Sequence, residues 1–427
     1  MSTIHPDLFT TVHTLEKHLA TSALQTDPLS AVIERFGAIA RQGDLSISRL
    51  MIGWRLLNPL YFVELLTWRA DHDLVVERLS RHDAKYNQDF ENTPIYAILN
   101  GEDDLMRCRL DRTNAPFEFP MFNDFARQGV TDYIITKVGF GRGYDMLKEE
   151  PGQGVVISFC SDRPGGFTDG EVAALERLRY MLALALRVTM EADMRATMAA
   201  TYLGASTAKK VMGGEVFRGE GQSIDAVIWY CDLRGSTQLC EEMGVEAYIP
   251  LLNDYFSAMA EPVVAEGGEV LDFIGDAVLA IFPNKEGAIM RALRAARGAL
   301  ANLDGLRARH PVIATRTAPA DLTGVAIDVG TVIYGNIGIP TRLAFSVIGP
   351  TVNKVTRVEG FTKELREPIL VTEAVARERP SLWRSCGLFD LAGVSEGVEL
   401  FALDAAIDDG NAVHRDRSGG HIGASRT

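Results

Sequence analysis

Two short, apolar, β-prone segments constrain the fold most, because each meets an aspartate at a turn. The first covers residues 226–237 and reads AVIWYCDLRGST, with Asp232 where the strand pattern gives way to a Gly-Ser-Thr turn. The second covers residues 267–282 and reads GGEVLDFIGDAVLAIF. Its Asp276 lies in a Gly-Asp turn between two apolar runs, a pattern typical of a β-hairpin.

Two carboxylates at adjacent strand ends supply the oxygen ligands that Mg²⁺ prefers. This ion usually keeps the phosphate oxygens of a substrate in its shell. Either aspartate alone has a simpler explanation, since Asp is common in turns and at helix N-termini. The pair with its flanking residues is more specific, and we expect a metal site there.

Composition limits the kind of protein. The 427 residues suffice for two or three domains, and 47% hydrophobic and 23% charged residues are typical of a folded soluble protein. A net charge of -14 without a basic tract disfavours nucleic-acid binding. Five cysteines without metal-binding spacing predict a reducing, cytoplasmic location. No apolar run approaches the length of a membrane span, so we expect no direct membrane insertion.

Residues 1–166 predict an α+β domain. Apolar residues recur at helical spacing in the first part, and apolar runs at 60–68, 131–138 and 154–160 predict strands of one antiparallel sheet. This arrangement is similar to that of GAF-type sensor modules, a resemblance that implies a regulatory role. A dimerisation domain without a ligand pocket is the alternative.

Residues 167–216 predict a helical connector. The sequence TDGE at 168–171 is a capping-box pattern that opens a helix reaching about Ala200. Its apolar stripe is typical of a core-facing helix or of a coiled-coil seam. In the second case the helix would dimerise, and Leu182→Glu with Leu186→Glu would dissociate the dimer.

Residues 217–405 predict a second α+β domain with alternating helices and antiparallel strands. The expected elements are a strand (224–232), a helix (244–265), a hairpin (269–282), a helix (285–303), a strand (323–329), a hairpin (332–348), a helix (352–364) and closing strands (369–372 and 398–402). Residues 406–427 are polar and Gly-rich and predict a disordered tail.

Three blocks of this domain resemble, in order and spacing, the catalytic blocks of the class III nucleotidyl (adenylate/guanylate) cyclases. The blocks are DLRGST at 232–237, FIGD at 273–276 and VNKVTR at 352–357. The resemblance implies a ferredoxin-like catalytic fold and conversion of a nucleoside triphosphate to a 3′,5′-cyclic nucleotide and diphosphate. It also implies two Mg²⁺ or Mn²⁺ ions per active site and a homodimer with composite sites.

The resemblance assigns the metal ions to Asp232, Asp276 and the carbonyl of Leu233. Amides of the turn before the next helix would cradle the phosphates, as helix N-termini do. The residues of this turn are Arg234, Gly235, Ser236 and Thr237.

Asn353 and Arg357 complete the site in the family, where they act on the metal site of the other subunit. Asn353 would orient the ribose, and Arg357 would donate charge-assisted hydrogen bonds to phosphate oxygens. The two residues are four positions apart, so they share one face of a helix.

Asp272 and Ser346 occupy the base-reading positions, where adenylate cyclases carry Lys and Asp or Thr. A carboxylate accepts hydrogen bonds, so Asp272 requires a donor on the base; guanine and uracil offer a ring N–H and cytosine an amino group. Guanylate cyclases have Glu and Cys here, and the Pycsar-type bacterial pyrimidine cyclases also lack the purine-reading pair. We therefore favour UTP, with GTP next and ATP as a further alternative. The Pycsar resemblance implies antiphage signalling through a product read by a separate effector.

Two alternatives stay open. A catalytically dead cyclase-like module could bind nucleotide or a partner, although both aspartates, Asn353 and Arg357 are retained. The GGEV sequence at 267–270 is superficially similar to the signature of diguanylate cyclases, but the carboxylates and the Asn/Arg block do not fit that enzyme.

Overall fold

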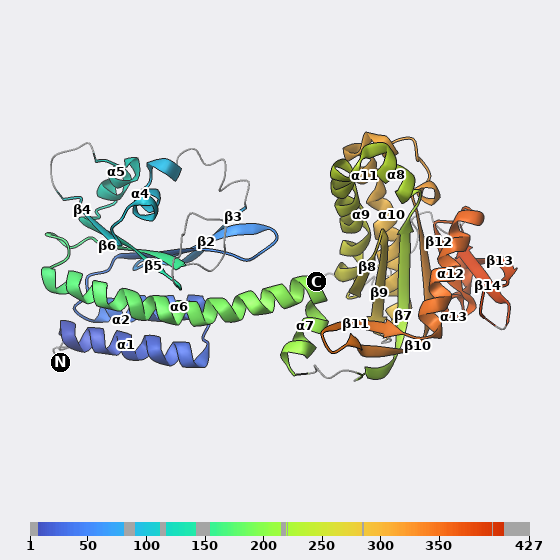
Figure 1. The fold of residues 1–427 in the computed structure, drawn as a ribbon, viewed down its shortest axis with the longest axis horizontal. Coiled ribbons are helices and arrows are strands. Elements are labelled where there is room, and N and C mark those ends of the chain that lie inside the picture. The colour runs from blue at the N-terminus through green and yellow to red at the C-terminus, as the bar shows by residue number, and fades with distance from the viewer. Residues whose placement is uncertain are drawn as a thin grey trace, which may run out of the picture. The chain divides into compact units, whose positions relative to one another are not determined.

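The computed structural model describes residues 7–80, 90–111, 117–141, 154–214, 219, 221–283, 286–394 and 396–404. Its contacts divide the chain into two compact units, Met1–Thr201 and Tyr202–Thr427 (Figure 1). The predicted tail at 406–427 lies outside the described residues. Within the described ranges, no helix combines the length and the apolar composition that crossing a bilayer requires.

The first unit contains a six-stranded antiparallel sheet in the order β3-β2-β1-β6-β5-β4. One face packs on α1, α2 and α6, and the other on α4 and α5 (Figure 1). The predicted N-terminal helices and the single antiparallel sheet are confirmed. The elements are α1 Leu8–Gln25, α2 Leu29–Gln42, β1 Arg49–Arg55, β2 Tyr61–Arg69, β3 His72–Ser80, α4 Pro94–Asn100, β4 Leu105–Arg109, α5 Pro120–Arg127, β5 Asp132–Gly139, β6 Gly154–Ser161 and α6 Asp169–Leu203.

The long helix α6 begins with the predicted capping box. The Thr168 N–H donates to Glu171 Oε2 at 2.8 Å, and the Glu171 N–H donates to Thr168 Oγ1 at 3.3 Å. Leu182 and Leu186 are fully buried in the core of the first unit. The interpretation of this stripe as an exposed dimer seam is therefore wrong, because Glu at either position would disrupt the core of one chain.

The second unit is built on a βαββαβ core, the ferredoxin-like arrangement predicted for it. The chain runs through β7, α9, β8, β9, α10 and β10, and the strands lie in the order β10-β7-β9-β8 with every neighbouring pair antiparallel. The elements are β7 Gly221–Leu233, α8 Ser236–Met243, α9 Val245–Ala265, β8 Glu269–Ile274, β9 Ala277–Pro283, α10 Ala288–Ala301 and β10 Thr323–Ile339.

The rest of the second unit extends this core. The strand β12 pairs in parallel with β10, β14 and β13 follow at that edge, and β11 folds back on β10. The prediction missed β13. The further elements are α7 Ala205–Met212, α11 Leu303–Arg309, β11 Arg342–Ile348, α12 Pro350–Glu364, β12 Ile369–Thr372, α13 Glu373–Ala376, β13 Trp383–Phe389 and β14 Val398–Leu403.

The predicted separation of the strand at 323–329 from the hairpin at 332–348 is wrong, because β10 Thr323–Ile339 is one continuous 17-residue strand. A Cβ at Gly330 would lie 2.5 Å from Thr351 Oγ1, so this glycine permits the close approach of α12. The glycine marks a helix contact and not a turn.

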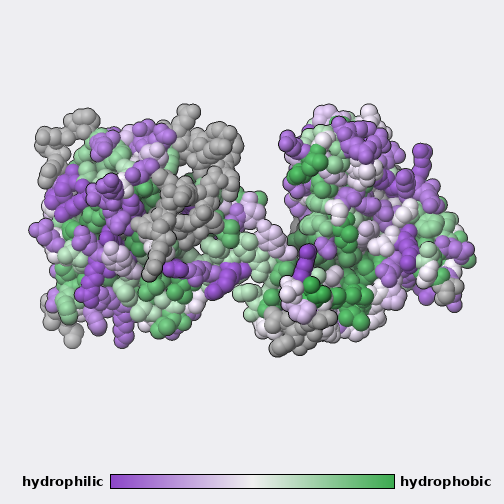
Figure 2. All heavy atoms as spheres, in the orientation of Figure 1, coloured by the Kyte–Doolittle hydropathy of each residue, from purple (hydrophilic) through white to green (hydrophobic). Residues whose placement is uncertain are grey.

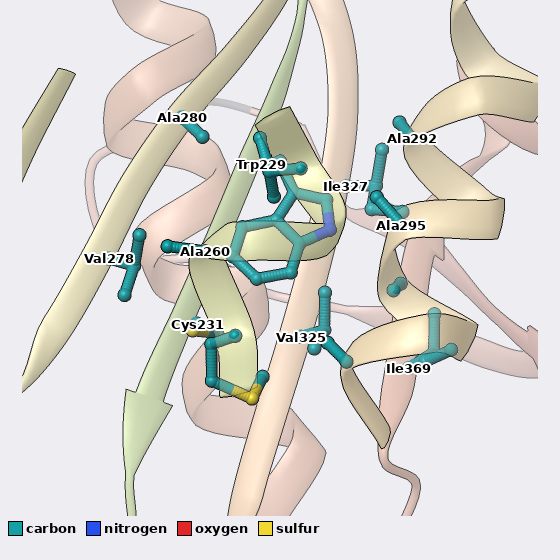
Figure 3. Packing of buried hydrophobic residues seen from close by; sticks show 14 of the residues in the cluster. Trp229, Cys231, Ala260, Val278, Ala280, Ala292, Ala295, Val325, Ile327 and Ile369 are labelled. Atoms are coloured by element: carbon teal, nitrogen blue, oxygen red, sulfur yellow. The ribbon is translucent and has the colours of Figure 1, made fainter. Parts of the chain in front are cut away.

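Trp229 anchors β7 in the hydrophobic core of the second unit. Its indole is fully buried between the sheet and α9 and α10, where small side chains make room for it (Figure 3). These include Ala260, Ala280, Ala292 and Ala295. Because side chains alternate along a strand, Tyr230 and Asp232 belong to the opposite face, which α12 covers.

Candidate active site

The structure brings Asp232 and Asp276 together. Asp232 is half-buried near the end of β7, and Asp276 is the second residue of the two-residue turn between β8 and β9. Gly275 opens this turn with a φ of 66°, a left-handed value that glycine adopts without strain. The carboxyl groups of the two aspartates share a hydrogen bond.

The pKa of Asp232 in this pair is raised well above the ordinary value of a carboxyl group. Burial raises the pKa of Asp232 to about 7, and the charges of Asp276 and Glu359 add to the effect. The N–H of Leu233 donates a hydrogen bond to the Asp232 carboxylate, and this bond partly opposes the rise of the Asp232 pKa. Two adjacent carboxyl groups can provide the hard oxygen donors that a divalent cation prefers. In the described part of the chain, no group of three or more His, Cys, Asp or Glu side chains is spaced to hold a metal ion. A divalent cation at this position would have to bind to this pair together with main-chain or substrate oxygens.

Glu359 on α12 is a third carboxylate at this site, and no local sequence pattern marks it. Gly324 on β10 pairs with Asp232 across the sheet. A Cβ at Gly324 would lie 1.9 Å from Thr362 Oγ1 and 2.6 Å from Glu359 Oε1. Burial raises the pKa of Glu359, while the charge of Arg234 and a hydrogen bond from Thr362 oppose the rise.

Arg234, the first residue of the predicted phosphate turn, points into the protein. Its Nη2 donates to Thr362 Oγ1 at 2.7 Å, and its Nε is buried without a hydrogen-bond partner among the described residues. Its backbone N–H donates to the Leu322 carbonyl at 3.0 Å, so this amide is already occupied. The amides of Gly235, Ser236 and Thr237 remain at the start of α8, where first-turn N–H groups have no intrahelical partner.

Arg316 brings a positive charge to the same turn. Its Nη1 donates to the Arg234 carbonyl, and its Nη2 lies 3.2 Å from where a Cβ would stand on Gly235. Arg307 donates from Nε to the Arg316 carbonyl at 2.7 Å and fixes the loop. Arg316 is 82 residues beyond Arg234, so only the tertiary structure shows that it belongs here.

Asn353 and Arg357 lie on α12 as predicted, but away from the aspartates of their own chain. Asn353 is exposed, and the Arg357 guanidinium lies beside Gly393, 3.5 Å from where a Cβ would stand. On an α-helix, Glu359 is rotated by about 200° from Arg357. The helix therefore directs Glu359 to the carboxylates of its own chain and the Asn/Arg pair in another direction.

A buried ion pair fixes the rotation of α12. Lys354 Nζ lies 2.8 Å from Asp328 Oδ2, and Thr372 Oγ1 donates to Asp328 Oδ1 at 2.5 Å. Asp328 is fully buried beneath the helix. Because Lys354 is next to Asn353, this anchor determines which face of α12 is presented outward.

Buried hydrogen bonds also hold the backbone of Asp232 in place. Thr323 Oγ1 donates to the Asp232 carbonyl at 2.9 Å, and the Tyr255 hydroxyl lies 2.8 Å from Thr323 Oγ1. Tyr255 and Thr323 are fully buried. The hydrogen-bonded chain ties β7 to α9 directly behind the carboxylate pair.

The two base-reading candidates lie on different strands of the second unit. Asp272 is exposed on β8 and pairs with Leu279, which itself pairs with Tyr230. Asp272 therefore belongs to the same face of the sheet as Tyr230 and Asp232. Ser346 is half-buried on β11, a strand that lies in contact with β8.

Residues 220–380 match the family model described as "Adenylate and Guanylate cyclase catalytic domain". An adenylate cyclase of Anabaena cylindrica is 34% identical over 182 residues, which is 42% of this chain and 35% of that protein. Adenylate cyclase 1 of Rhizobium meliloti is 28% identical over 176 residues, or 41% of this chain and 26% of that protein. The chain thus spans about a third or less of the length of these curated relatives.

Solved structures of cyclases also match the chain. The crystal structure of an adenylyl cyclase from P. aeruginosa is 25% identical, with a TM-score of 0.38, over 43% of this chain and 96% of that one. A guanylyl cyclase structure is 25% identical, with a TM-score of 0.38, over 43% of this chain and 93% of that one. The matched family and the named relatives are nucleotide cyclases, which are lyases.

Proposed function

We propose that this chain is a nucleotide cyclase that converts a nucleoside triphosphate to a 3′,5′-cyclic nucleotide and diphosphate. The observation that carries the proposal is the adjacent pair of Asp232 and Asp276 at one end of a ferredoxin-like sheet. The pair lies within the segment that matches the cyclase catalytic domain, and the named relatives support the same activity.

Asp232, Asp276 and the Leu233 carbonyl would hold two Mg²⁺ or Mn²⁺ ions together with phosphate oxygens. The metal ions would lower the pKa of the ribose 3′-hydroxyl and neutralise charge on the leaving diphosphate. The aspartates fit this role because they are close enough to share a hydrogen bond. The ions themselves are a proposal.

The triphosphate would bind at the start of α8. The amides of Gly235, Ser236 and Thr237 point from a helix N-terminus, which favours negative charge. Arg316 adds a guanidinium at the same turn. This positive group offsets part of the repulsion between the substrate and the three carboxylates nearby.

We propose a homodimer in which Asn353 and Arg357 serve the site of the other subunit. Their direction on α12, away from the aspartates of their own chain, supports this arrangement. Apolar side chains are exposed on β8, β10 and β11, and Figure 2 shows apolar residues gathered on this unit. They are Phe273, Ile274, Ile333, Ile339 and Ile348.

Asp272 and Ser346 would read the base. An exposed carboxylate on β8 accepts a hydrogen bond, and uracil and guanine both present a ring N–H. We favour UTP as substrate, with GTP next; in the UTP case a separate effector would read the product in antiphage signalling. The named relatives are adenylate cyclases, so ATP is the outcome that would overturn this reading of Asp272.

The first unit would act as a GAF-like regulatory domain. A cavity of about 300 Å³ lies between its sheet and α4, lined mostly by apolar side chains. Its walls include Met51, Trp54, Leu65, Leu79, Ile95 and Leu99. A cavity of this kind suits a small apolar ligand and favours a sensor over a dimerisation domain without a pocket.

Complementation tests the shared site. Asp276→Ala and Asn353→Ala should each be inactive, because each homodimer has a defect in both sites. A mixture that forms heterodimers should regain activity, since one of its two composite sites is intact. The absence of recovery in proven heterodimers would contradict shared sites. An inactive wild-type chain that still binds nucleotide would favour the catalytically dead module.

A further inference from the structure

The helix α12 carries a carboxylate that faces the metal site of its own chain. Glu359 Oε1 lies beside Gly324, 2.6 Å from where a Cβ would stand, and Gly324 pairs with Asp232. A side chain at position 324 would occupy this space. The absence of a Cβ there lets Glu359 approach the strand that holds Asp232.

Arg234 is the positive group next to this carboxylate. Its Nη2 donates to Thr362 Oγ1 at 2.7 Å, and the Thr362 hydroxyl also lies 3.2 Å from Glu359 Oε1. Arg234 and Glu359 are both half-buried. Their charges therefore act on each other with less screening than on the open surface.

This arrangement balances charge beside a cation site. A half-buried guanidinium close to Asp232 repels a cation bound there unless another group compensates its charge. Glu359 supplies that compensation. Without it, the Arg234 charge would act directly on a bound metal ion.

We propose that Glu359 is a positioning residue that compensates Arg234 and thereby sets the cation affinity of the Asp232–Asp276 pair in its own chain. The proposal rests on the proposed cyclase function, but its test measures Mn²⁺ binding and does not require cyclase activity. Glu359 is not assigned as a metal ligand, since no three-carboxylate group in the described residues is spaced to hold an ion.

One consequence concerns the two sites of a dimer. Glu359 faces the site of its own chain, whereas Asn353 and Arg357 are directed elsewhere and would serve the partner's site. A single helix, held by Lys354 and Asp328, then carries residues for both sites.

Mn²⁺ binding to the full-length chain without nucleotide, measured by calorimetry, tests the compensation. Glu359→Gln should weaken Mn²⁺ binding by about tenfold, as the loss of one nearby charge predicts. Glu364→Gln, the same change at an exposed position of α12, is the matched control and should bind as the wild type does. Unchanged Mn²⁺ affinity in Glu359→Gln, with Asp276→Ala strongly weakened, would overturn the proposal.

The double variant Arg234→Gln/Glu359→Gln separates charge compensation from packing. If Glu359 acts through the Arg234 charge, removal of both charges should restore most of the lost Mn²⁺ affinity. If Glu359 only supports the fold, the double variant should bind no better than Glu359→Gln, and the proposal fails. This comparison decides the question even if Glu359→Gln is partly unfolded.

Complementation then assigns the residue to a site. At a Mn²⁺ concentration that saturates the wild type but not Glu359→Gln, a mixture of Glu359→Gln and Asn353→Ala should regain activity, whereas a mixture of Glu359→Gln and Asp276→Ala should not. Recovery in the second mixture would place Glu359 with the partner's site and overturn the proposal. Failure of the proposed function is distinguishable, because an inactive wild type would leave the Mn²⁺ measurements to decide the role of Glu359.

Discussion

Gly324 on β10 stands directly opposite Asp232 on β7, and the space that a Cβ would need at Gly324 holds Thr362 and Glu359 of α12. This contact joins the strand that carries Asp232, the proposed metal ligand, to the helix with the Asn/Arg pair. The distance between these two elements therefore depends on the absence of one methyl group.

Gly324→Ala should displace α12 and impair catalysis. The new Cβ would lie 1.9 Å from Thr362 Oγ1, so the helix has to move. We expect about a hundredfold loss of kcat, as misplacement by about 1 Å produces in other enzymes. Gly360→Ala on the same helix is the control, because a Cβ there meets nothing within 4 Å. Wild-type activity in Gly324→Ala would contradict the contact.

Cation binding should depend on pH through Asp232. Its raised pKa of about 7 in the metal-free protein means that a proton competes with the cation below neutral pH. Apparent Mn²⁺ affinity should therefore fall as the pH is lowered from 8 to 6, with proton release on binding near pH 7. Calorimetry in buffers of different ionisation enthalpy measures this release. A Mn²⁺ affinity that is constant over this pH range would contradict the raised pKa of Asp232.

The raised pKa of Asp232 also affects the stability of the metal-free protein. Cation affinity should rise with pH, whereas this contribution to stability should fall with pH. The folded pKa of Asp232 lies above the ordinary value, so protonation of Asp232 stabilises the fold at low pH, and this contribution disappears as the pH rises through 7. In the presence of chelator, the wild type should lose stability between pH 5.5 and pH 8 relative to Asp276→Asn, which lacks the charged partner. Parallel curves of thermal unfolding would contradict the prediction.

The hydrogen bonds of Thr323 and Tyr255 should contribute to stability in a defined order, measured as loss of unfolding free energy. Thr323→Val removes the hydroxyl that bonds both the Asp232 carbonyl and Tyr255, and should cost about 1–3 kcal/mol of unfolding free energy. Tyr255→Phe leaves the bond to the carbonyl intact and should cost about 1 kcal/mol. Urea unfolding measures both. A larger loss in Tyr255→Phe would contradict the proposed chain of hydrogen bonds.

The sequence patterns predicted the elements that carry the carboxylate pair. The strand at 224–232, the Gly-Asp hairpin and the helix at 352–364 all have their counterparts in β7, β8–β9 and α12. These predictions succeeded because apolar periodicity and turn chemistry are local. The separation of the strand at 323–329 from the hairpin at 332–348 failed because β10 continues through Gly330, where the missing side chain allows a close packing contact.

The residues that tertiary contacts bring to the site could not be predicted. Glu359 reaches it through the space at Gly324, and Arg316 through a loop after α11. Neither belongs to a local pattern. The spacing of the α6 stripe is typical of a core-facing helix and of a coiled-coil seam, and the structure confirms the core interpretation at Leu182 and Leu186.

Arg316 should contribute to nucleotide binding. Arg316→Met removes the guanidinium beside Gly235 and should raise the KM for the nucleotide by about tenfold, as loss of one charge-assisted contact does. Arg309→Met on α11 is the control, because Arg309 is exposed and pairs with Asp254. An unchanged KM with a reduced kcat would assign Arg316 a role other than triphosphate binding.

The most direct test of the account is product analysis. The purified chain is incubated separately with ATP, GTP, CTP and UTP in the presence of Mn²⁺, with Asp276→Ala as the control, and the products are identified by mass spectrometry. We predict a 3′,5′-cyclic nucleotide from the wild type alone, with UTP as the preferred substrate. Cyclic AMP alone would confirm the cyclase and contradict the interpretation of Asp272. No cyclic product from any nucleotide, with Mn²⁺ bound, would contradict the central claim.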